Sequence, residues 1–289
     1  MTPQVTSGLL VVLMLAAPVV PEQAQKFSSR TLGVRVDVLV TDGRNPIGGL
    51  KAADFELRDN GVVQKVEVVD ATDVAINAVL ALDTSASITG RRKTDLVAAG
   101  ETILDGLRPV DRAALTTFSH AVTPKIPLTS DFASVRGALQ AIEPRGQTSV
   151  MDGVYVALTS TLDQSGRFLI VVCTDGSDTT SWLQPREVLD AAKRANGVIY
   201  AVTAADAKKS DALKDLADAT GGQVLQVKSS AELRAAFQRI LNEFRSRYVL
   251  AYSPEGVPPG GFHTLEISVP KRRATVKART GYIGVEPAK

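Results

Sequence analysis

Residues 76–87 read INAVLALDTSAS, and this stretch decides the fold. Its first seven residues are apolar apart from one asparagine, which is the pattern of a β-strand covered on both faces. The remaining five, Asp83-Thr84-Ser85-Ala86-Ser87, are polar or small and follow the strand directly. Oxygen-bearing side chains in the loop after a buried strand lie where open α/β sheets bind their ligands. The stretch therefore predicts an α/β domain with a site at the end of this strand.

A second stretch of the same kind lies further along the chain. The apolar run Phe168–Cys173 is followed at once by Thr174-Asp175-Gly176-Ser177-Asp178. Around the two runs, helical and strand patterns alternate, which predicts an α/β domain at residues 74–246 with a doubly wound, mostly parallel sheet and helices on both faces. The expected helices cover residues 94–107, 131–142, 149–162, 185–195, 210–219 and 231–244, and the further strands cover 111–118, 122–128, 198–202 and 223–227. Prolines in 122–128 favour an edge strand.

The two flanks of this domain have β patterns instead. Val34–Val40 alternates in polarity, and Asp59-Asn60-Gly61 lies between two extended segments as a hairpin turn does. Strand patterns return after the last predicted helix, and Lys271-Arg272-Arg273 is expected to be a solvated hairpin turn between two of them. We predict that residues 31–73 and 247–285 pack together as a small β module.

The N-terminus predicts export. Gly8–Val20 is a run of apolar and small residues that is too short to span a bilayer comfortably and fits the hydrophobic part of a signal peptide. No Lys or Arg precedes Lys26, so the basic segment that usually opens a signal peptide is missing. We expect residues 1–25 to be a signal peptide, and the mature protein to be secreted or periplasmic without a stable membrane span.

Composition narrows the classes of function. The chain has 289 residues and a formal net charge of +2, which is too balanced for a general attraction to nucleic acid or to an anionic membrane. The sequence contains neither of the glycine-rich patterns that cradle phosphates, which argues against nucleotide binding. Cys173 is the single cysteine, so the chain cannot form an internal disulfide, and its place in an apolar run indicates a buried thiol.

Three polar clusters are expected at one edge of the sheet. They are the loops after the two buried runs and the stretch Gly146-Gln147-Thr148-Ser149, which precedes a predicted helix. Carboxylate and hydroxyl oxygens without His or Cys are hard ligands, which suit Mg²⁺, Mn²⁺ or Ca²⁺ better than Zn²⁺. Only two carboxylates, Asp83 and Asp175, are offered to a dication that takes about six oxygens. An acidic side chain of a partner protein is therefore expected to complete the site, which is binding chemistry and requires no catalysis.

Five of these residues carry a resemblance to a known family. Asp83-x-Ser85-x-Ser87, Thr148 and Asp175 resemble the metal-ion-dependent adhesion site of von Willebrand factor type A domains. The resemblance implies a Rossmann-like fold, a bound Mg²⁺ with Mn²⁺ or Ca²⁺ as alternatives, and a partner that presents an Asp or Glu carboxylate. It also implies unequal roles, in which Ser85 and Ser87 bind the metal directly and Asp83 orients the site, often through water. Thr148 would engage according to conformation, and Asp175 would be the second anionic anchor.

The flanks resemble a narrower group, the bacterial exported proteins described as von Willebrand A-related. The segments that carry this resemblance are Val36–Asp42, Gly49–Glu56 with the turn at Asp59-Asn60-Gly61, and the tail Tyr248–Tyr282. No function is well established for that group. The resemblance therefore sharpens the domain boundaries more than the activity.

Several residues near the expected site admit more than one interpretation. Asp152 and Asp178 either support the metal ligands or are helix-start charges, and Trp182 is either a contact for a partner or a loop anchor. His120 follows a strand, but the sequence has no nucleophile elbow, so we interpret it as a solvated loop histidine and expect no enzyme. Beside the adhesion-type binding module, two alternatives remain. One is a structural or assembly subunit of a bacterial envelope complex whose metal serves only integrity, and the other, least favoured, is a metal-dependent hydrolase.

Overall fold

The structure is a computed structural model that describes residues 33–71, 74–162, 165–175, 177–207 and 209–284. The chain divides into residues 1–32 and residues 33–289. The predicted signal peptide, residues 1–25, lies outside the described residues. Within the described ranges, no helix is long and apolar enough to cross a membrane.

A six-stranded sheet forms the centre of the α/β part, in the order β11-β10-β9-β6-β7-β8. The strands pair in parallel except β8, which runs antiparallel to β7 at one edge. The doubly wound, mostly parallel sheet predicted from the sequence is thereby confirmed, with the proline-containing strand at its edge. The bounds are β6 Ile76–Asp83, β7 Arg112–Phe118, β8 Val122–Thr129, β9 Arg167–Thr174, β10 Gly197–Ala204 and β11 Gln223–Val227.

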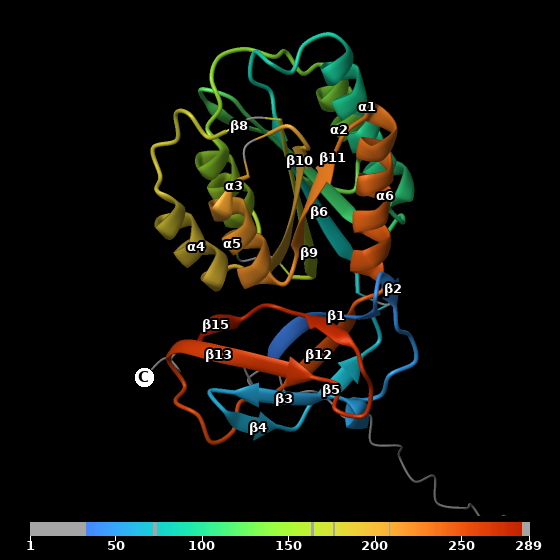
Figure 1. The fold of residues 1–289 in the computed structure, drawn as a ribbon, viewed down its shortest axis with the longest axis vertical. Helices are drawn as coiled ribbons and strands as arrows, with labels where there is room; N and C mark the ends of the chain where they lie inside the picture. Colours follow the sequence, from blue (N-terminus) through green and yellow to red (C-terminus); the bar gives the residue numbers. More distant parts are fainter. Residues whose placement is uncertain (1–32, 72–73, 163–164, 176, 208, 285–289) are drawn as a thin grey trace, which may run out of the picture. The chain divides into compact units, whose positions relative to one another are not determined.

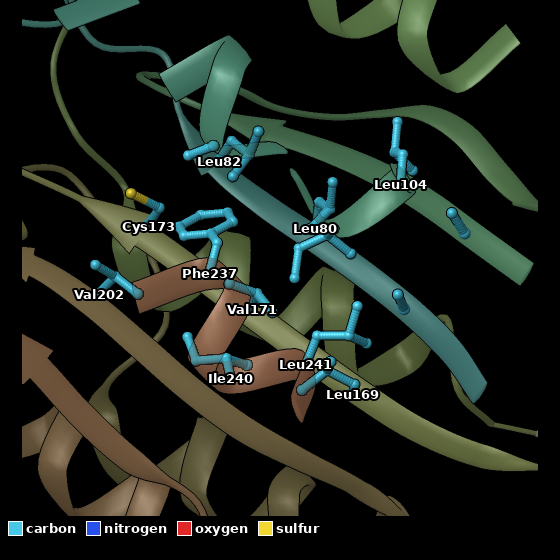
Figure 2. Packing of buried hydrophobic residues seen from close by; sticks show 14 of the residues in the cluster. Leu80, Leu82, Leu104, Leu169, Val171, Cys173, Val202, Phe237, Ile240 and Leu241 are labelled. Atoms are coloured by element: carbon cyan, nitrogen blue, oxygen red, sulfur yellow. The ribbon is translucent and has the colours of Figure 1, made fainter. Parts of the chain in front are cut away.

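Within the described ranges, six helices cover the two faces of this sheet, three on each (Figure 1). Successive residues of β6 point to opposite faces, so Leu80 and Leu82 pack under α1, α2 and α6 while Val79 and Ala81 pack under α3, α4 and α5. Figure 2 shows the first of these cores, where Phe237 and Leu241 of α6 lie over the central strands. The bounds are α1 Arg91–Gly106, α2 Phe132–Gln140, α3 Val150–Thr159, α4 Pro185–Arg194, α5 Asp211–Thr220 and α6 Ser230–Arg245.

Strands from both flanks of the chain share two further sheets. In one the order is β14-β1-β12-β5 with β2 beside β1, and in the other it is β15-β13-β3-β4. The predicted hairpin turn is confirmed, because β3 and β4 pair across Asn60 and Gly61, which have φ of 46° and 81°. The bounds are β1 Val34–Asp42, β2 Asn45–Pro46, β3 Glu56–Asp59, β4 Val62–Gln64, β5 Glu67–Val69, β12 Tyr248–Tyr252, β13 Gly261–Ser268, β14 Thr275–Lys277 and β15 Gly281–Gly284, with the short 3₁₀ helix Ala52–Asp54 between β2 and β3.

The hairpin expected at Lys271-Arg272-Arg273 is wrong. These three residues are exposed, but β13 pairs with β3 and β15 while β14 pairs with β1, so the turn carries the chain from one sheet to the other. Val269 is buried in the core between the two sheets, and this buried anchor places the turn at a corner. The extended segment after Asn60-Gly61 likewise forms two strands, β4 and β5, and Val66 is buried where the chain passes from one to the other.

Candidate functional site

Backbone and side-chain hydrogen bonds bring the three predicted polar loops together at the carboxyl edge of the central sheet. In the loop after β6, Thr84 O accepts a hydrogen bond from Arg145 N at 2.8 Å, and Ala86 N donates one to Gly146 O at 3.0 Å. On its other side, the Thr174 hydroxyl at the end of β9 donates to Asp83 Oδ2 at 2.6 Å. The loop that begins at Asp83 is therefore fixed between the loops that contain Thr148 and Asp175.

Three oxygens of this loop cluster form a row. Ser85 Oγ lies 3.0 Å from Ser87 Oγ, and the Ser87 hydroxyl donates to Asp175 Oδ1 at 2.9 Å. Neighbouring ligands of an octahedral Mg²⁺ with bonds of 2.0–2.1 Å stand about 2.9 Å apart. Two hydrogen bonds therefore hold these oxygens side by side, close enough for one dication to bind all three. Within the described ranges no group of three or more His, Cys, Asp and Glu could hold a metal, so a cation here would depend on hydroxyl ligands as well as carboxylates.

Asp83 is fully buried at the base of the row. Its Oδ1 accepts a hydrogen bond from Ser85 N at 2.8 Å, and its Oδ2 accepts the one from Thr174. Burial raises the pKa of Asp83, and the nearby charge of Asp175 adds to the rise, while the bonds from Thr174 and Ser85 oppose it. A cation next to this carboxylate would relieve the cost of keeping it charged.

Thr148 is nearly buried in the neighbouring loop, at 7% exposure. Its backbone is held on both sides, because Thr148 N donates to Thr179 Oγ1 at 3.1 Å and Thr148 O accepts from Thr179 N at 2.9 Å. Its hydroxyl makes no hydrogen bond among the described residues. The structure thus links Asp83, Ser85, Ser87 and Asp175 through contacts, and places Thr148 in the neighbouring loop, which contacts Thr84 and Ala86 at Arg145 and Gly146.

Asp152 and Asp178 hold the loop that follows Asp175. The two oxygens of Asp152, on α3, accept the backbone N–H groups of Trp182 and Leu183, each at 3.0 Å. The Asp178 carboxylate accepts hydrogen bonds from Met151 N at 2.9 Å and from Ser181 N at 3.0 Å. Both carboxylates therefore bond backbone donors, and they fix a loop that presents Trp182 to solvent with 91% of its surface exposed.

His120 lies at the rim of the site, against the Thr148 loop. A Cβ added to Gly146 would stand 2.1 Å from His120 Nδ1, so the ring covers a position that only glycine, with φ of 74°, fits. The hydroxyl of the adjacent Ser119 is 3.4 Å from the same nitrogen. The His120 ring therefore lies against Gly146, and among the described residues no hydrogen bond joins it to Ser85 or Ser87.

Arg92 is the residue of this site that the sequence analysis missed. It lies in the first turn of α1, and its Nη1 is 2.5 Å from Asp175 Oδ2. One signal in the sequence points to it. Arg91, Arg92 and Lys93 open the helix without an acidic residue in that turn, although the positive end of a helix dipole disfavours cations. An acidic group outside the helix was therefore to be expected beside them.

A groove of about 760 Å³ adjoins Asp175. It runs between the start of α1, the ends of β9 and β10, and the start of α6, and both Arg92 and Asp175 line it. Its floor is apolar, with Ile88 and Val202, and Lys228 and Asp206 lie on its walls. The edge of the sheet thus offers a row of oxygens with an open groove next to it.

Comparisons with known proteins agree with this architecture. A sequence model of the von Willebrand factor type A domain family matches residues 77–239. A curated relative, the inter-alpha-trypsin inhibitor heavy chain H2 of Sus scrofa, is 22% identical over 209 residues. That match covers 67% of this chain but 22% of the relative, so the chain spans about a fifth of the relative's length.

Solved structures show the same fold at low sequence identity. A von Willebrand factor type A protein from Catenulispora acidiphila is 12% identical with a TM-score of 0.54, and the match covers 89% of this chain and 75% of that one. Proximal thread matrix protein 1 from the mussel byssus, with a zinc-occupied MIDAS motif, is 17% identical with a TM-score of 0.55 and coverages of 64% and 49%. The PilB minor pilin from Streptococcus sanguinis is 13% identical with a TM-score of 0.50 and coverages of 60% and 62%.

Proposed function

Because this chain belongs to the von Willebrand factor type A domain family, we propose that it is a binding protein that holds a divalent cation at the carboxyl edge of its sheet. The cation is Mg²⁺ in preference to Mn²⁺ or Ca²⁺. Its open position takes an Asp or Glu carboxylate of a partner protein. The ligands are Asp83, Ser85, Ser87, Thr148 and Asp175.

The row of three adjoining oxygens is the observation that carries this proposal. Ser85 Oγ, Ser87 Oγ and Asp175 Oδ1 follow one another at hydrogen-bond distances of 3.0 and 2.9 Å, so one cation could bind all three. The two carboxylates and three hydroxyls offer few oxygens for Ca²⁺, which takes about six to eight, and suit the smaller shell of Mg²⁺ better. The hard donor set, with no nitrogen or sulfur, also favours Mg²⁺ over the zinc found in the byssus protein.

Two carboxylates supply the charge, and they leave the cation in need of further oxygen ligands. Asp83 is buried and held on both oxygens, so it anchors the site, while Asp175 is 12% exposed at the mouth of the groove. A carboxylate from outside would reach the cation from the groove side. Trp182, fixed by Asp152 and almost fully exposed, is placed to meet the protein that carries this carboxylate.

The first experiment measures binding of Mg²⁺ and Mn²⁺ by calorimetry and by thermal stability. At about 100 times the dissociation constant, a ligand that binds only the folded state stabilises it by about 2.7 kcal/mol. We expect Asp83→Ala and Ser87→Ala to abolish or strongly reduce this shift. Asp206→Ala and Ser177→Ala, which remove an exposed carboxylate and an exposed hydroxyl that are not among the proposed ligands, are the matched controls.

The second experiment captures partners from the organism's own envelope with and without EDTA. If EDTA abolishes the capture of a partner, the result supports binding of the partner's carboxylate through the metal. Capture that survives EDTA, with metal stabilisation intact, would instead favour the structural or assembly subunit. A correctly folded wild type that shows no response to Mg²⁺ or Mn²⁺ would refute the proposal.

A further inference from the structure

The two oxygens of Asp175 already have partners within the protein. Oδ1 accepts the Ser87 hydroxyl at 2.9 Å, and Oδ2 forms an ion pair with Arg92 Nη1 at 2.5 Å. The Arg92 side chain is 58% exposed and that of Asp175 is 12% exposed, so the guanidinium comes from the solvent side. A cation of the protein's own thus occupies one side of the carboxylate at the mouth of the site.

The start of α1 favours this pairing. Gly90, with φ of 55°, caps the helix and no side chain accepts its first N–H groups, so the partial positive charge of the helix end is not offset locally. Arg91, Arg92 and Lys93 add three full charges there. Arg91 is turned toward Asp95, at 3.8 Å, whereas Arg92 extends across to Asp175 in the loop after β9. Crowding of positive charge at the helix end therefore directs Arg92 toward the metal site.

We infer that Arg92 is a built-in competitor of the divalent cation, so that metal affinity is set by an exchange of partners at Asp175. The inference rests on the proposed function, because it requires that Asp175 is a metal ligand. A dication held by Asp175 would bring its charge next to that of the Arg92 guanidinium, which contacts the same carboxylate, and the two like charges would repel. By linkage the effect is reciprocal, so bound metal also weakens the hold of Asp175 on Arg92.

The competition is mild, because the Arg92 guanidinium is more than half exposed and water screens the ion pair. An exposed pair is worth up to about 1 kcal/mol, which corresponds to about a fivefold change in a binding constant. Arg92 therefore raises the metal concentration that the site requires without closing it. Its release on metal binding frees a guanidinium at the edge of the groove.

The sequence offers a matched pair of variants for the test. Arg92→Gln removes the competing charge, and Arg91→Gln removes an equal charge from the adjacent residue, which contacts Asp95 instead. Mg²⁺ affinity of the full chain is measured by calorimetry, and the fluorescence of Trp182, the single tryptophan, gives an independent readout. We expect Arg92→Gln to bind Mg²⁺ about fivefold more tightly than wild type and Arg91→Gln to stay within about twofold.

Arg92→Lys provides a second test, since it keeps the charge but loses the planar fork. Its affinity should fall between those of wild type and Arg92→Gln. Thermal stability in EDTA checks that each variant is folded.

The outcomes separate this inference from the proposed function. If wild type binds Mg²⁺ and Arg92→Gln behaves as Arg91→Gln does, the competitor role is refuted and the metal site stands. Weaker binding by Arg92→Gln would also refute it, because Arg92 would then support the bound state. If neither wild type nor Arg92→Gln binds metal, both proposals fail.

Discussion

Asp83, at the scale of one residue, is a buried carboxylate whose charge opposes the stability of the fold around it. The carboxylate is fully buried, and burial raises its pKa. Asparagine has the same shape and can still accept the bond from Ser85 N, while the Thr174 hydroxyl can reverse its role and accept. We expect metal-free Asp83→Asn to be more stable than wild type at pH 7 by roughly 1–2 kcal/mol, within the range found when buried charges are replaced by neutral groups.

The pH dependence of this difference has a definite sign. A carboxyl whose folded pKa is raised binds its proton more tightly in the folded state, so wild type gains stability as pH falls through that raised pKa. The advantage of the asparagine variant should therefore narrow between pH 7 and pH 4. Urea unfolding in EDTA measures it, and the variant should gain nothing from Mg²⁺. An advantage that stays constant with pH would mean that the pKa of Asp83 is the same in the folded and unfolded states, and would contradict this account.

The candidate ligands could be named from the sequence because each follows or precedes a recognisable element. Asp83 and Asp175 come at the ends of two apolar runs, and the parallel topology then places both at one edge. Arg92 could not be paired in this way. Helical spacing predicted a helix from residue 94, whereas α1 begins at Arg91, and the direction of an arginine in the first turn depends on that start. The roles of the ligands stay predictions until metal binding is measured.

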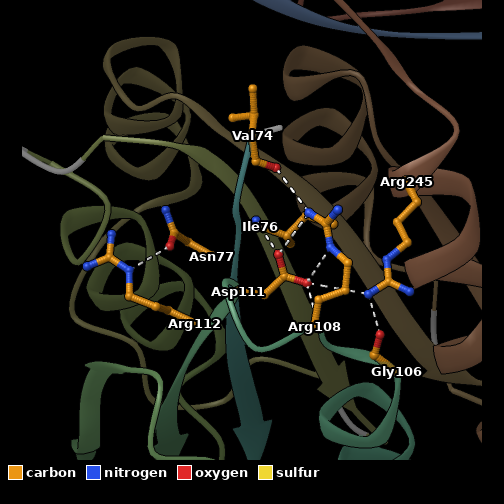
Figure 3. A network of polar contacts seen from close by, with 8 residues as sticks. All are labelled: Val74, Ile76, Asn77, Gly106, Arg108, Asp111, Arg112 and Arg245. Atoms are coloured by element: carbon orange, nitrogen blue, oxygen red, sulfur yellow. Dashed lines mark hydrogen bonds and ion pairs between the residues drawn. The ribbon is translucent and has the colours of Figure 1, made fainter. Parts of the chain in front are cut away.

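At the scale of elements, Asp111 connects the start of β6, the segment before β7 and the end of α6 (Figure 3). The carboxylate is fully buried, and Oδ1 accepts Ile76 N at the start of β6 at 2.9 Å. Arg108, before β7, lies 3.2 Å from Oδ1, and Arg245, at the end of α6, lies 3.4 Å from Oδ2. Burial alone would raise the pKa of Asp111, but the backbone bonds from Ile76 and Arg108 and the Arg108 guanidinium outweigh it and hold the pKa below its usual value.

We therefore expect Asp111→Asn to destabilise the protein by about 2–3 kcal/mol at pH 7, because it breaks buried charge pairs. A carboxyl with a lowered folded pKa contributes stability above its unfolded pKa and loses it as pH falls through the folded value. The difference in unfolding free energy between wild type and variant should therefore stay constant down to about pH 4 and decrease below it. Urea unfolding at several pH values measures this difference. Asp105→Asn, which removes an exposed carboxylate paired with Arg136 near the end of α1, should change stability by less than about 0.5 kcal/mol. Equal effects of the two substitutions would contradict this account.

The β-strands show which part of the fold the polarity pattern does not predict. Alternating polarity identifies a strand and the face that it buries, but it does not identify the partner strand. The hairpin at Asn60-Gly61 was recognisable because a two-residue turn fixes its own pairing. The turn at Lys271–Arg273 has no such constraint, and burial of Val269 between two sheets decides its course, which is a tertiary effect that local sequence does not show.

At the scale of the whole described chain, buried arginines join the flanking strands to the central sheet. Arg247 is 1% exposed and donates to Gly221 O at 2.5 Å and Tyr200 Oη at 3.0 Å on the α/β side, and to Asp37 O of β1 at 3.2 Å. Arg167, at the start of β9, forms an ion pair with Asp37 at 2.5 Å. Short β-rich segments from distant parts of the sequence are therefore held against the end of the sheet opposite to the candidate site. The boundaries of a separate β module stay a prediction.

Arg247→Met tests whether these contacts couple the two parts. Methionine fills similar space but leaves the Gly221 and Asp37 carbonyls without this donor, and several lost bonds of about 1 kcal/mol each predict a destabilisation of roughly 2–4 kcal/mol. In Arg247→Met, amide hydrogen exchange should accelerate in β1 and β12, while β9 and β10 keep their protection. The control Arg272→Met, at an exposed residue, should leave stability and exchange in all four strands unchanged. Metal affinity should stay within about twofold of wild type, because Arg167 and Thr174 bound a strand of about 23 Å and the site lies at its far end. A fall in metal affinity together with the loss of flank protection would show instead that the flanks control the site through the sheet.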